Sequence, residues 1–133
     1  MKSIKNAHSV SVIGYHIIWC TKYRKEILYN QVEVELKHII GEVCIEYGWK
    51  PRSLEVMPDH VHLFIQCDHL TRPVDISSTL KSISAVRIFT LFPKLKGRAF
   101  WGSGLWSRGT YYSTVGHISE DVIVKYIETQ KKQ

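Results

Sequence analysis

One pair of neighbouring segments constrains the fold of this chain more than any other part of the sequence. Trp49 to Val56 and His60 to Cys67 each have the composition of a strand, and Pro58-Asp59 between them is typical of a turn. In the second segment every other residue from Val61 onward is apolar, and a strand points alternate side chains to opposite faces. The fold must therefore hold two consecutive strands joined by a short turn.

The segments on either side of this pair predict two more strands and two helices. His8 to Trp19 is rich in Val, Ile, Tyr and Trp, and Leu105 to Val115 contains the last strand-like run. Apolar residues recur at helical spacing from Val32 to Tyr47, where Gly48 stands in the place of a left-handed cap. A second helical pattern runs from about Val74 to Leu91.

The remaining segments predict a loop and a terminal helix. Gly97 to Gly104 is glycine-rich and loop-like, and a final helix begins near Ser119, a good N-cap. The order is β-α-β-β-α-β followed by one helix, which predicts an α+β, ferredoxin-like (RRM-like) fold. We expect one domain over residues 1–133, with an antiparallel sheet, helices on one face and a C-terminal helix over about residues 118–131. This architecture hosts many activities, so it does not by itself identify a function.

The charge of the chain indicates a polyanionic partner. The formal net charge is +6 and the isoelectric point is about 9.3, and Lys and Arg side chains neutralise phosphates. Cations alternate with aromatic residues in stretches such as Trp19 to Lys25. Bases of unpaired strands stack on aromatic rings while cations hold the backbone, so the mixture favours single-stranded nucleic acid.

Other features of the composition exclude several classes of protein. No apolar run approaches the roughly 20 residues of a membrane helix, and the first residues lack the apolar core of a signal peptide. We therefore expect a cytoplasmic protein without a membrane partner. The three cysteines, Cys20, Cys44 and Cys67, are widely spaced, which predicts reduced thiols in or near the core and no disulfide framework.

Two histidines in the third predicted strand are candidates for metal binding. His60 and His62 are separated by one residue, so both project from the same face, with Cα atoms about 6.6 Å apart. Side chains at that spacing can converge on one ion, while Val61 points into the core. Two histidines alone make an incomplete zinc site, and an isolated pair of this kind more often has no metal.

A second pair of residues lies near the end of the chain. Tyr126 and Gln130 are four residues apart, so on a helix both project from one face about one turn apart. Val122 and Ile123 can anchor such a helix, and Ile127 adds an apolar contact. A tyrosine on such a helix is more often a packing residue than a nucleophile.

Taken together, these motifs resemble the single-tyrosine HUH transposases of small bacterial and archaeal insertion sequences, where U is a hydrophobic residue. Met57 to Ile65 carries the HUH motif, and further matches follow the family's order in Tyr15 to Arg24, Leu105 to Gly116 and Tyr126 to Gln130. Leu80-Lys81-Ser82 is a looser match. The resemblance covers nearly the whole chain.

The resemblance implies a role for each matching residue. His60 and His62 correspond to the metal ligands of the family, Gln130 to its third protein ligand, and Tyr126 to its nucleophile. Imidazole, amide and phosphate oxygen ligands suit Mg²⁺ or Mn²⁺. The implied activity is cleavage and rejoining of single-stranded DNA at hairpin-marked element ends through a 5′-phosphotyrosine link.

The resemblance also implies a homodimer whose active sites combine the histidines of one subunit with the tyrosine of the other. On this hypothesis the terminal helix is mobile, and Gly116-His117-Ile118 is the joint that lets it carry Tyr126 between sites. Six basic residues are candidate phosphate contacts, which we assign to DNA only as a group. They are Lys22, Arg24, Lys25, Arg52, Lys81 and Arg108.

Four alternatives stay open from the sequence. The chain could be a replication initiator or plasmid relaxase of the HUH type, although those usually have longer chains. It could be a repeat-associated relative that serves chromosomal palindromes. A non-catalytic nucleic-acid-binding module on the same fold is disfavoured because only Phe64 accompanies the two histidines as a stacking residue. A small metal-binding protein is disfavoured by the incomplete ligand set.

Overall fold

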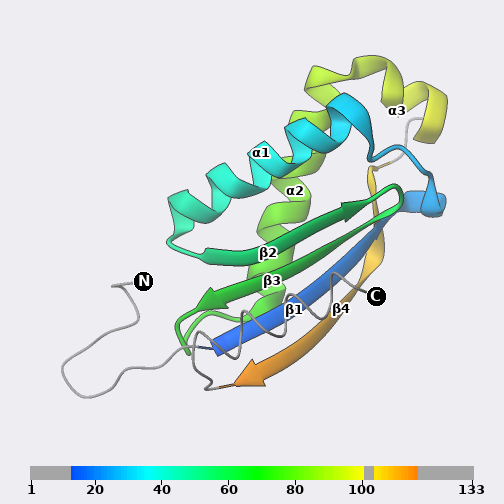
Figure 1. Cartoon of the computed structure of the whole chain (residues 1–133). Coiled ribbons are helices and arrows are strands. Elements are labelled where there is room, and N and C mark those ends of the chain that lie inside the picture. The colour runs from blue at the N-terminus through cyan, green and yellow to red at the C-terminus, as the bar shows by residue number, and fades with distance from the viewer. Residues whose placement is uncertain (1–12, 101–103, 117–133) are drawn as a thin grey trace.

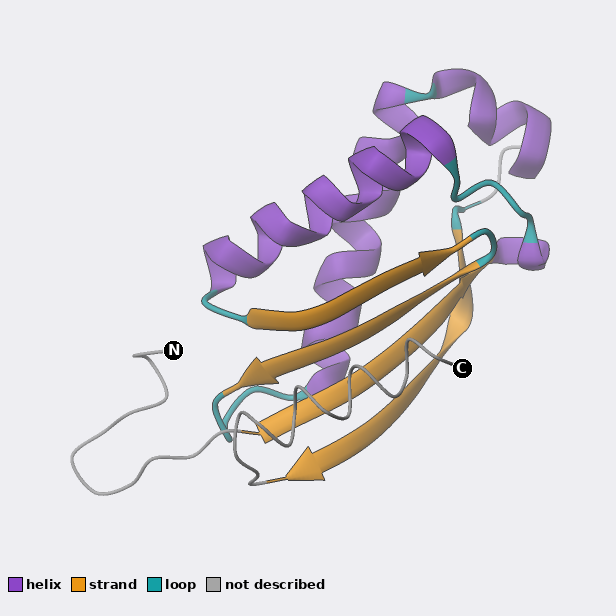
Figure 2. Cartoon of the chain, viewed as in Figure 1, coloured by secondary structure: helices purple, strands orange, loops and turns teal. Residues whose placement is uncertain are grey.

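The computed structural model describes residues 13–100 and 104–116, which form a four-stranded sheet with helices packed on one side of it (Figures 1 and 2). The elements follow one another in the order β1 (Ile13–Thr21), a short 3₁₀ turn η2 (Lys22–Arg24), α1 (Asn30–Tyr47), β2 (Lys50–Met57), β3 (His60–Cys67), α2 (Pro73–Leu91), α3 (Pro93–Phe100) and β4 (Trp106–Gly116). None of the helices in these ranges is both long enough and apolar enough to cross a membrane.

The sheet has the strand order β2-β3-β1-β4, and each neighbouring pair is antiparallel. This order confirms the ferredoxin-like fold that the βαββαβ pattern predicts. The strands β3 and β1 are interior, so backbone hydrogen bonds hold each of them on both sides. The predicted turn Pro58-Asp59 joins β2 to β3, and β3 has the predicted bounds.

The core lies between the sheet and the helices, and alternation along the strands determines which residues enter it. Val61, Leu63 and Ile65 of β3 are fully buried, as their spacing predicts. Helices α1 and α2 contribute Leu36, Ile39, Ile40, Val43, Ile76, Leu80 and Ile88 to the same cluster. Burying each side chain of this size contributes roughly 1.5–3 kcal/mol relative to leaving it exposed.

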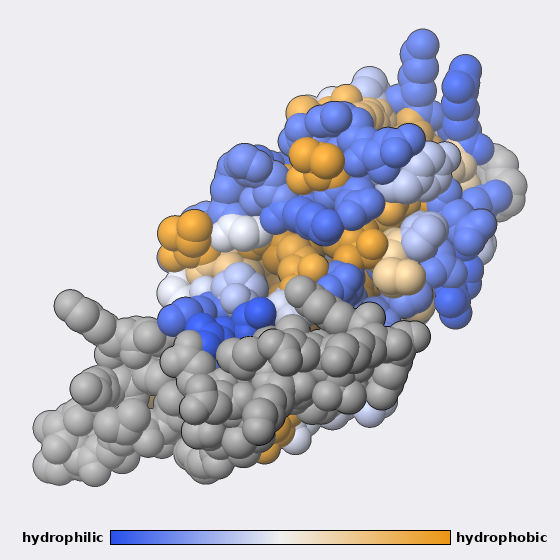
Figure 3. Space-filling view, in the orientation of Figure 1, coloured by the Kyte–Doolittle hydropathy of each residue, from blue (hydrophilic) through white to orange (hydrophobic). Residues whose placement is uncertain are grey.

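Helix α1 lies over the sheet with its outer surface in solvent. Hydrophilic side chains cover most of that surface, and apolar side chains show mainly where α1 meets β2 (Figure 3). The helix ends as predicted: Gly48 adopts the left-handed conformation with φ 74°, and its N–H donates to the carbonyls of Cys44 and Ile45. A residue with a Cβ adopts this conformation only at a cost.

The predicted loop from Gly97 to Gly104 is wrong in its first half, because α3 continues as far as Phe100. Phe100 is fully buried and its ring lies 5.8 Å from the ring of Phe89. Leu95 and Ala99 also pack against the core. Tertiary contacts of this apolar side of the helix outweigh the poor helix propensity of Gly97. The predicted helix from Ser119 lies outside the described residues, as does the stretch from His8 to Val12 of the first predicted strand.

Candidate functional site

His60 and His62 lie at the start of the interior strand β3, on the face of the sheet that points away from the helices. Their neighbour Val61 points into the core, so the two imidazoles project from the opposite side. We call this side the histidine face, defined by His16, His60 and His62. Pairing fixes the position of β3: Cys20 of β1 lies opposite His60, and Ile18 lies opposite His62.

The two imidazoles are close enough to share one ligand. Their ring centroids are 4.8 Å apart and the rings are inclined by 51°. The Nδ1 atom of His60 lies 2.6 Å from Oδ1 of Asp59, a hydrogen bond in which the ring N–H donates to the carboxylate. The Nε2 atom of His60 is then the nitrogen with a lone pair for a metal ion.

A third histidine, His16 of β1, adjoins this pair and was not singled out from the sequence. Its ring centroid lies 5.6 Å from that of His62, and the side chain is buried. The periodicity of β1 contains the signal, because His16 interrupts an apolar strand on the same face as Ile18. Only the antiparallel register brings it beside β3.

Electrostatics keep these imidazoles in the form that binds metals. Burial lowers the pKa of His62, and the neighbouring His60 and His16 lower it further, while Glu55 opposes the shift. Burial also lowers the pKa of His16. Both rings therefore favour the neutral state at neutral pH, and a neutral imidazole nitrogen is the ligand that a divalent cation needs.

The donor set on the histidine face fits part of a metal site. His60 and His62 supply two imidazole nitrogens, and Asp59 orients one of them. Within residues 13–100 and 104–116, no group of three His, Cys, Asp or Glu side chains could hold a metal ion. Any further protein ligand must therefore be of another residue type or come from elsewhere. The predicted ligand Gln130 and the predicted nucleophile Tyr126 lie outside the described residues.

The six predicted phosphate contacts come from four segments of the fold: the turn after β1, strand β2, helix α2 and strand β4. The turn that carries Lys22, Arg24 and Lys25 follows β1 beside the start of β3, where the N–H of Thr21 donates to the carbonyl of Asp59 over 2.9 Å. In that turn the Nε atom of Arg24 lies 2.9 Å from Oδ2 of Asp59. Arg52 is separate from them on β2, at the other edge of the sheet from β4.

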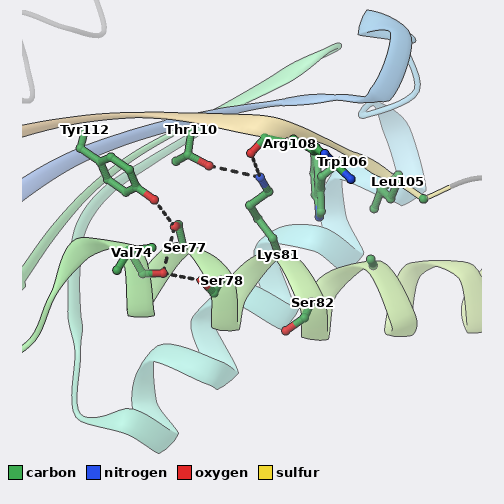
Figure 4. Close-up of a pocket in the computed structure, with 12 residues that line it drawn as sticks. Val74, Ser77, Ser78, Lys81, Ser82, Leu105, Trp106, Arg108, Thr110 and Tyr112 are labelled. Carbon is green, nitrogen blue, oxygen red and sulfur yellow. Dashed lines mark hydrogen bonds between the residues drawn. The ribbon is translucent and has the colours of Figure 1, made fainter.

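Lys81 and Arg108 line an open groove between α2 and β4, on the helix side of the sheet (Figure 4). The groove has a volume of about 420 Å³. The ammonium of Lys81 donates to the carbonyl of Ser107 over 2.8 Å, to that of Arg108 over 3.3 Å and to the hydroxyl of Thr110 over 3.1 Å. All three of its protons therefore have acceptors within the protein.

Two further hydrogen bonds join α2 to β4 along the same groove. The hydroxyls of Ser77 and Tyr112 are 2.7 Å apart, and the indole N–H of Trp106 donates to Ser84 Oγ over 3.0 Å. Ser77, Lys81 and Ser84 follow helical spacing, so one stripe of α2 is a polar contact with the edge strand. This stripe was not recognised from the sequence, because its residues have no apolar periodicity.

Comparisons with known proteins find relatives of this chain both by sequence and by fold. Residues 9–130 match the family model described as "Transposase IS200 like". The chain is 39% identical over 118 residues to the ISDra2 transposase TnpA of Deinococcus radiodurans, covering 89% of this chain and 84% of that protein. It is 25% identical over 128 residues to the transposase of insertion sequence IS200 from Salmonella typhimurium, covering 94% and 84%.

Two solved structures share the fold. A candidate transposase from Deinococcus radiodurans superposes with a TM-score of 0.76 and 36% identity, covering 95% of this chain and 96% of that one. A REP-associated tyrosine transposase bound to a REP hairpin superposes with a TM-score of 0.58 and 16% identity, covering 96% and 73%. At that identity the second structure supports the fold alone.

Proposed function

The chain belongs to the family of IS200-like transposases, and we propose that it cleaves and rejoins single-stranded DNA through a covalent tyrosine intermediate. The observation that carries the proposal is the pairing of His60 and His62 on one face of β3, with rings 4.8 Å apart. Because a metal-free binding module has no use for two clustered imidazoles of which one is oriented by a carboxylate, the arrangement favours an enzyme. The active unit is residues 1–133 as one domain, with a helix over about residues 118–131.

In the proposed reaction the phenolic oxygen of Tyr126 attacks the scissile phosphorus. A bond forms between that oxygen and phosphorus, and the bond from phosphorus to the 3′ oxygen breaks. The phenol gives its proton to solvent, and the departing 3′ oxygen takes a proton from solvent. The products are a 5′-phosphotyrosine and a free 3′-OH. One phosphodiester replaces another, so a second 3′-OH can reverse the step and join new ends without ATP.

Tyr126 needs help, because a free phenol has a pKa near 10 and is a weak nucleophile at neutral pH. His60, His62 and Gln130 would hold a divalent cation, either Mg²⁺ or Mn²⁺. Such a cation polarises the phosphate and stabilises the charge that develops in the transition state. The histidines themselves do two things: they present imidazole nitrogens toward one ion, and the strand sets the spacing between the two rings.

The proposed substrate is a hairpin at an element end. The fold relative cited above is a tyrosine transposase bound to a REP hairpin, and a DNA hairpin is the partner that we propose for this chain. A net charge of +6 suits such a polyanion. Among the predicted phosphate contacts, the basic turn of Lys22, Arg24 and Lys25 adjoins the histidine face, because Arg24 contacts Asp59, the residue before His60.

One experiment tests the activity directly. The protein is incubated with Mg²⁺ or Mn²⁺ and single-stranded hairpin DNA from both flanks of its own locus, and denaturing electrophoresis detects covalent adducts. We expect an adduct that disappears in Tyr126→Phe and in the presence of EDTA, and that is strongly reduced in His60→Ala. An adduct that persists in Tyr126→Phe would assign the nucleophile elsewhere. No adduct with either flank would favour a non-catalytic binding module.

We also propose a homodimer in which the histidines of one subunit act with Tyr126 of the other. Mixing the double variant His60→Ala/His62→Ala with Tyr126→Phe tests this arrangement, because each parent is inactive. Recovered cleavage in the mixture supports sites shared between subunits. If mixed dimers form but never cleave, the site is complete within one chain.

A further inference from the structure

We propose that Arg24 and Asp59 are positioning residues that fix which ring nitrogen of His60 faces the metal site. The proposal rests on the proposed function, in which His60 is a metal ligand, and adds two residues that no motif assigns to the site. It gives Arg24 a role within the protein, where the sequence suggested only a phosphate contact.

The three side chains form a continuous chain of contacts. Arg24 Nε donates to Asp59 Oδ2 over 2.9 Å, and Asp59 Oδ1 accepts from His60 Nδ1 over 2.6 Å. The two oxygens of one carboxylate are therefore used by two different partners.

Hydrogen bonds of the turn hold in place the backbone that carries the Asp59 carboxylate. The carbonyl of Asp59 accepts from the N–H of Thr21 over 2.9 Å, and the carbonyl of Pro58 accepts from the N–H of Leu28 over 2.9 Å. These bonds tie the β2–β3 turn to the segment that follows β1. The position of Asp59 is thus determined by two segments far apart in the sequence.

Arg24 reaches Asp59 from an unfavourable backbone conformation. Tyr23 and Arg24 have φ angles of 61° and 53°, both in the left-handed region. A residue with a Cβ adopts this region only at an energetic cost. The side chain of Arg24 is 66% exposed, and water and salt screen an ion pair at such an exposed position. Stability gained from this pair does not offset the strain, and backbone strain of this kind concentrates at functional sites.

The chemical consequence concerns the tautomer of His60. A neutral imidazole carries its proton on either nitrogen, and only the nitrogen without it can bind a cation. A carboxylate that accepts from Nδ1 keeps the proton there and leaves Nε2 as the donor atom toward the metal. Arg24 holds the other oxygen of the same carboxylate, which prevents Asp59 from rotating away.

The test reads the tautomer itself, without DNA and without activity. We would record ¹⁵N NMR spectra of the histidine rings in the metal-free, full-length protein at about pH 8.5, roughly two units above the ordinary histidine pKa. We expect His60 to carry its proton on Nδ1, and Asp59→Ala to move the ring toward the Nε2–H form. Arg24→Ala should produce a smaller shift in the same direction.

The matched control is Arg87→Ala, which breaks an ion pair between Arg87 and Glu42 of 2.7 Å on the helix side of the molecule. It should leave the His60 signals unchanged. Asp59→Leu, whose side chain has no hydrogen-bond acceptor, serves as a second variant if Asp59→Ala does not fold. An unchanged His60 tautomer in folded Asp59 variants overturns the proposal.

A second measurement connects the tautomer to the metal. Mn²⁺ binding followed by electron paramagnetic resonance should weaken about 10- to 100-fold in Asp59→Ala, which is the usual effect of losing such a partner. A shifted tautomer with unchanged Mn²⁺ affinity would overturn the link to metal binding. Failure of the proposed function has a different signature: the expected tautomer and Mn²⁺ affinity would persist while no covalent DNA adduct forms.

Discussion

Replacement of Lys81 by methionine distinguishes a structural role for this lysine from a phosphate contact. Methionine keeps the apolar stem but removes three hydrogen bonds of 2.8, 3.3 and 3.1 Å. Bonds from a charged donor contribute roughly 1.5–3 kcal/mol each. Burial lowers the pKa of Lys81, and the desolvation cost behind this shift offsets part of the summed hydrogen-bond energy. In the variant, water in the open groove can also bind the two carbonyls that lose the ammonium.

We therefore count only about one of the three bonds as a net contribution, and expect Lys81→Met to lose about 2 kcal/mol of unfolding free energy. Urea denaturation of the full chain, monitored by circular dichroism, measures the loss. Lys94→Met is the control, because Lys94 is exposed on α3 and such a surface change stays within about 0.5 kcal/mol.

DNA binding provides the second readout for Lys81. A lysine that neutralises a phosphate reduces the slope of log K against log salt by about 0.7–0.9 when it is removed. Because the protein itself occupies all three protons of this ammonium, we expect Lys81→Met to leave that slope unchanged. Unaltered stability together with a smaller salt slope would refute this reasoning and restore Lys81 as a phosphate contact.

Three further predictions concern α1 and its C-cap. Gly41→Ala should raise the unfolding free energy by roughly 0.5–1 kcal/mol, because Gly41 lies within the helix with nothing within 4 Å of an added Cβ. Gly48→Ala should lower the unfolding free energy by roughly 1–2 kcal/mol, since φ at Gly48 is 74°. If urea denaturation showed changes of the same sign for both variants, the backbone conformations described for these two glycines would be contradicted. Burial raises the pKa of Cys44 to about 12 from 9.0, so between pH 8 and 10 the unfolded thiol ionises while the native one stays protonated. Stability should fall by about 1.4 kcal/mol over that range on this account, and Cys44→Ala should remove that part of the pH dependence.

The residues that carry the strongest local patterns are those that the sequence placed correctly. Alternation along β3 predicted both the burial of Val61 and the common face of His60 and His62. The left-handed end of α1 at Gly48 followed from a single residue type. These features depend on neighbours within a few positions along the chain, which is the range over which periodicity and backbone preference act.

The features that the sequence did not reveal depend on contacts between distant segments. His16 joins the histidine face through the pairing of β1 with β3, and Asp59 reads as an ordinary turn residue until Arg24 is placed beside it. The helical course of α3 depends on the burial of Phe100, which outweighs the glycine that precedes it. Sequence patterns cannot supply such information, because tertiary contacts override local preference.

The interior position of β3 has a consequence for how an active site of this kind can be assembled. His60 and His62 belong to a strand that is paired with Cys20 and Ile18 on one side and with Met57 and Glu55 on the other. Their separation cannot change unless backbone ladders on both sides break, so ordering this half of the site costs almost no conformational entropy. In the proposed mechanism, the entropy cost of completing the site would then fall on the segment that carries Tyr126. Substitutions in that segment would change how often Tyr126 reaches the site, while His60 and His62 keep their geometry.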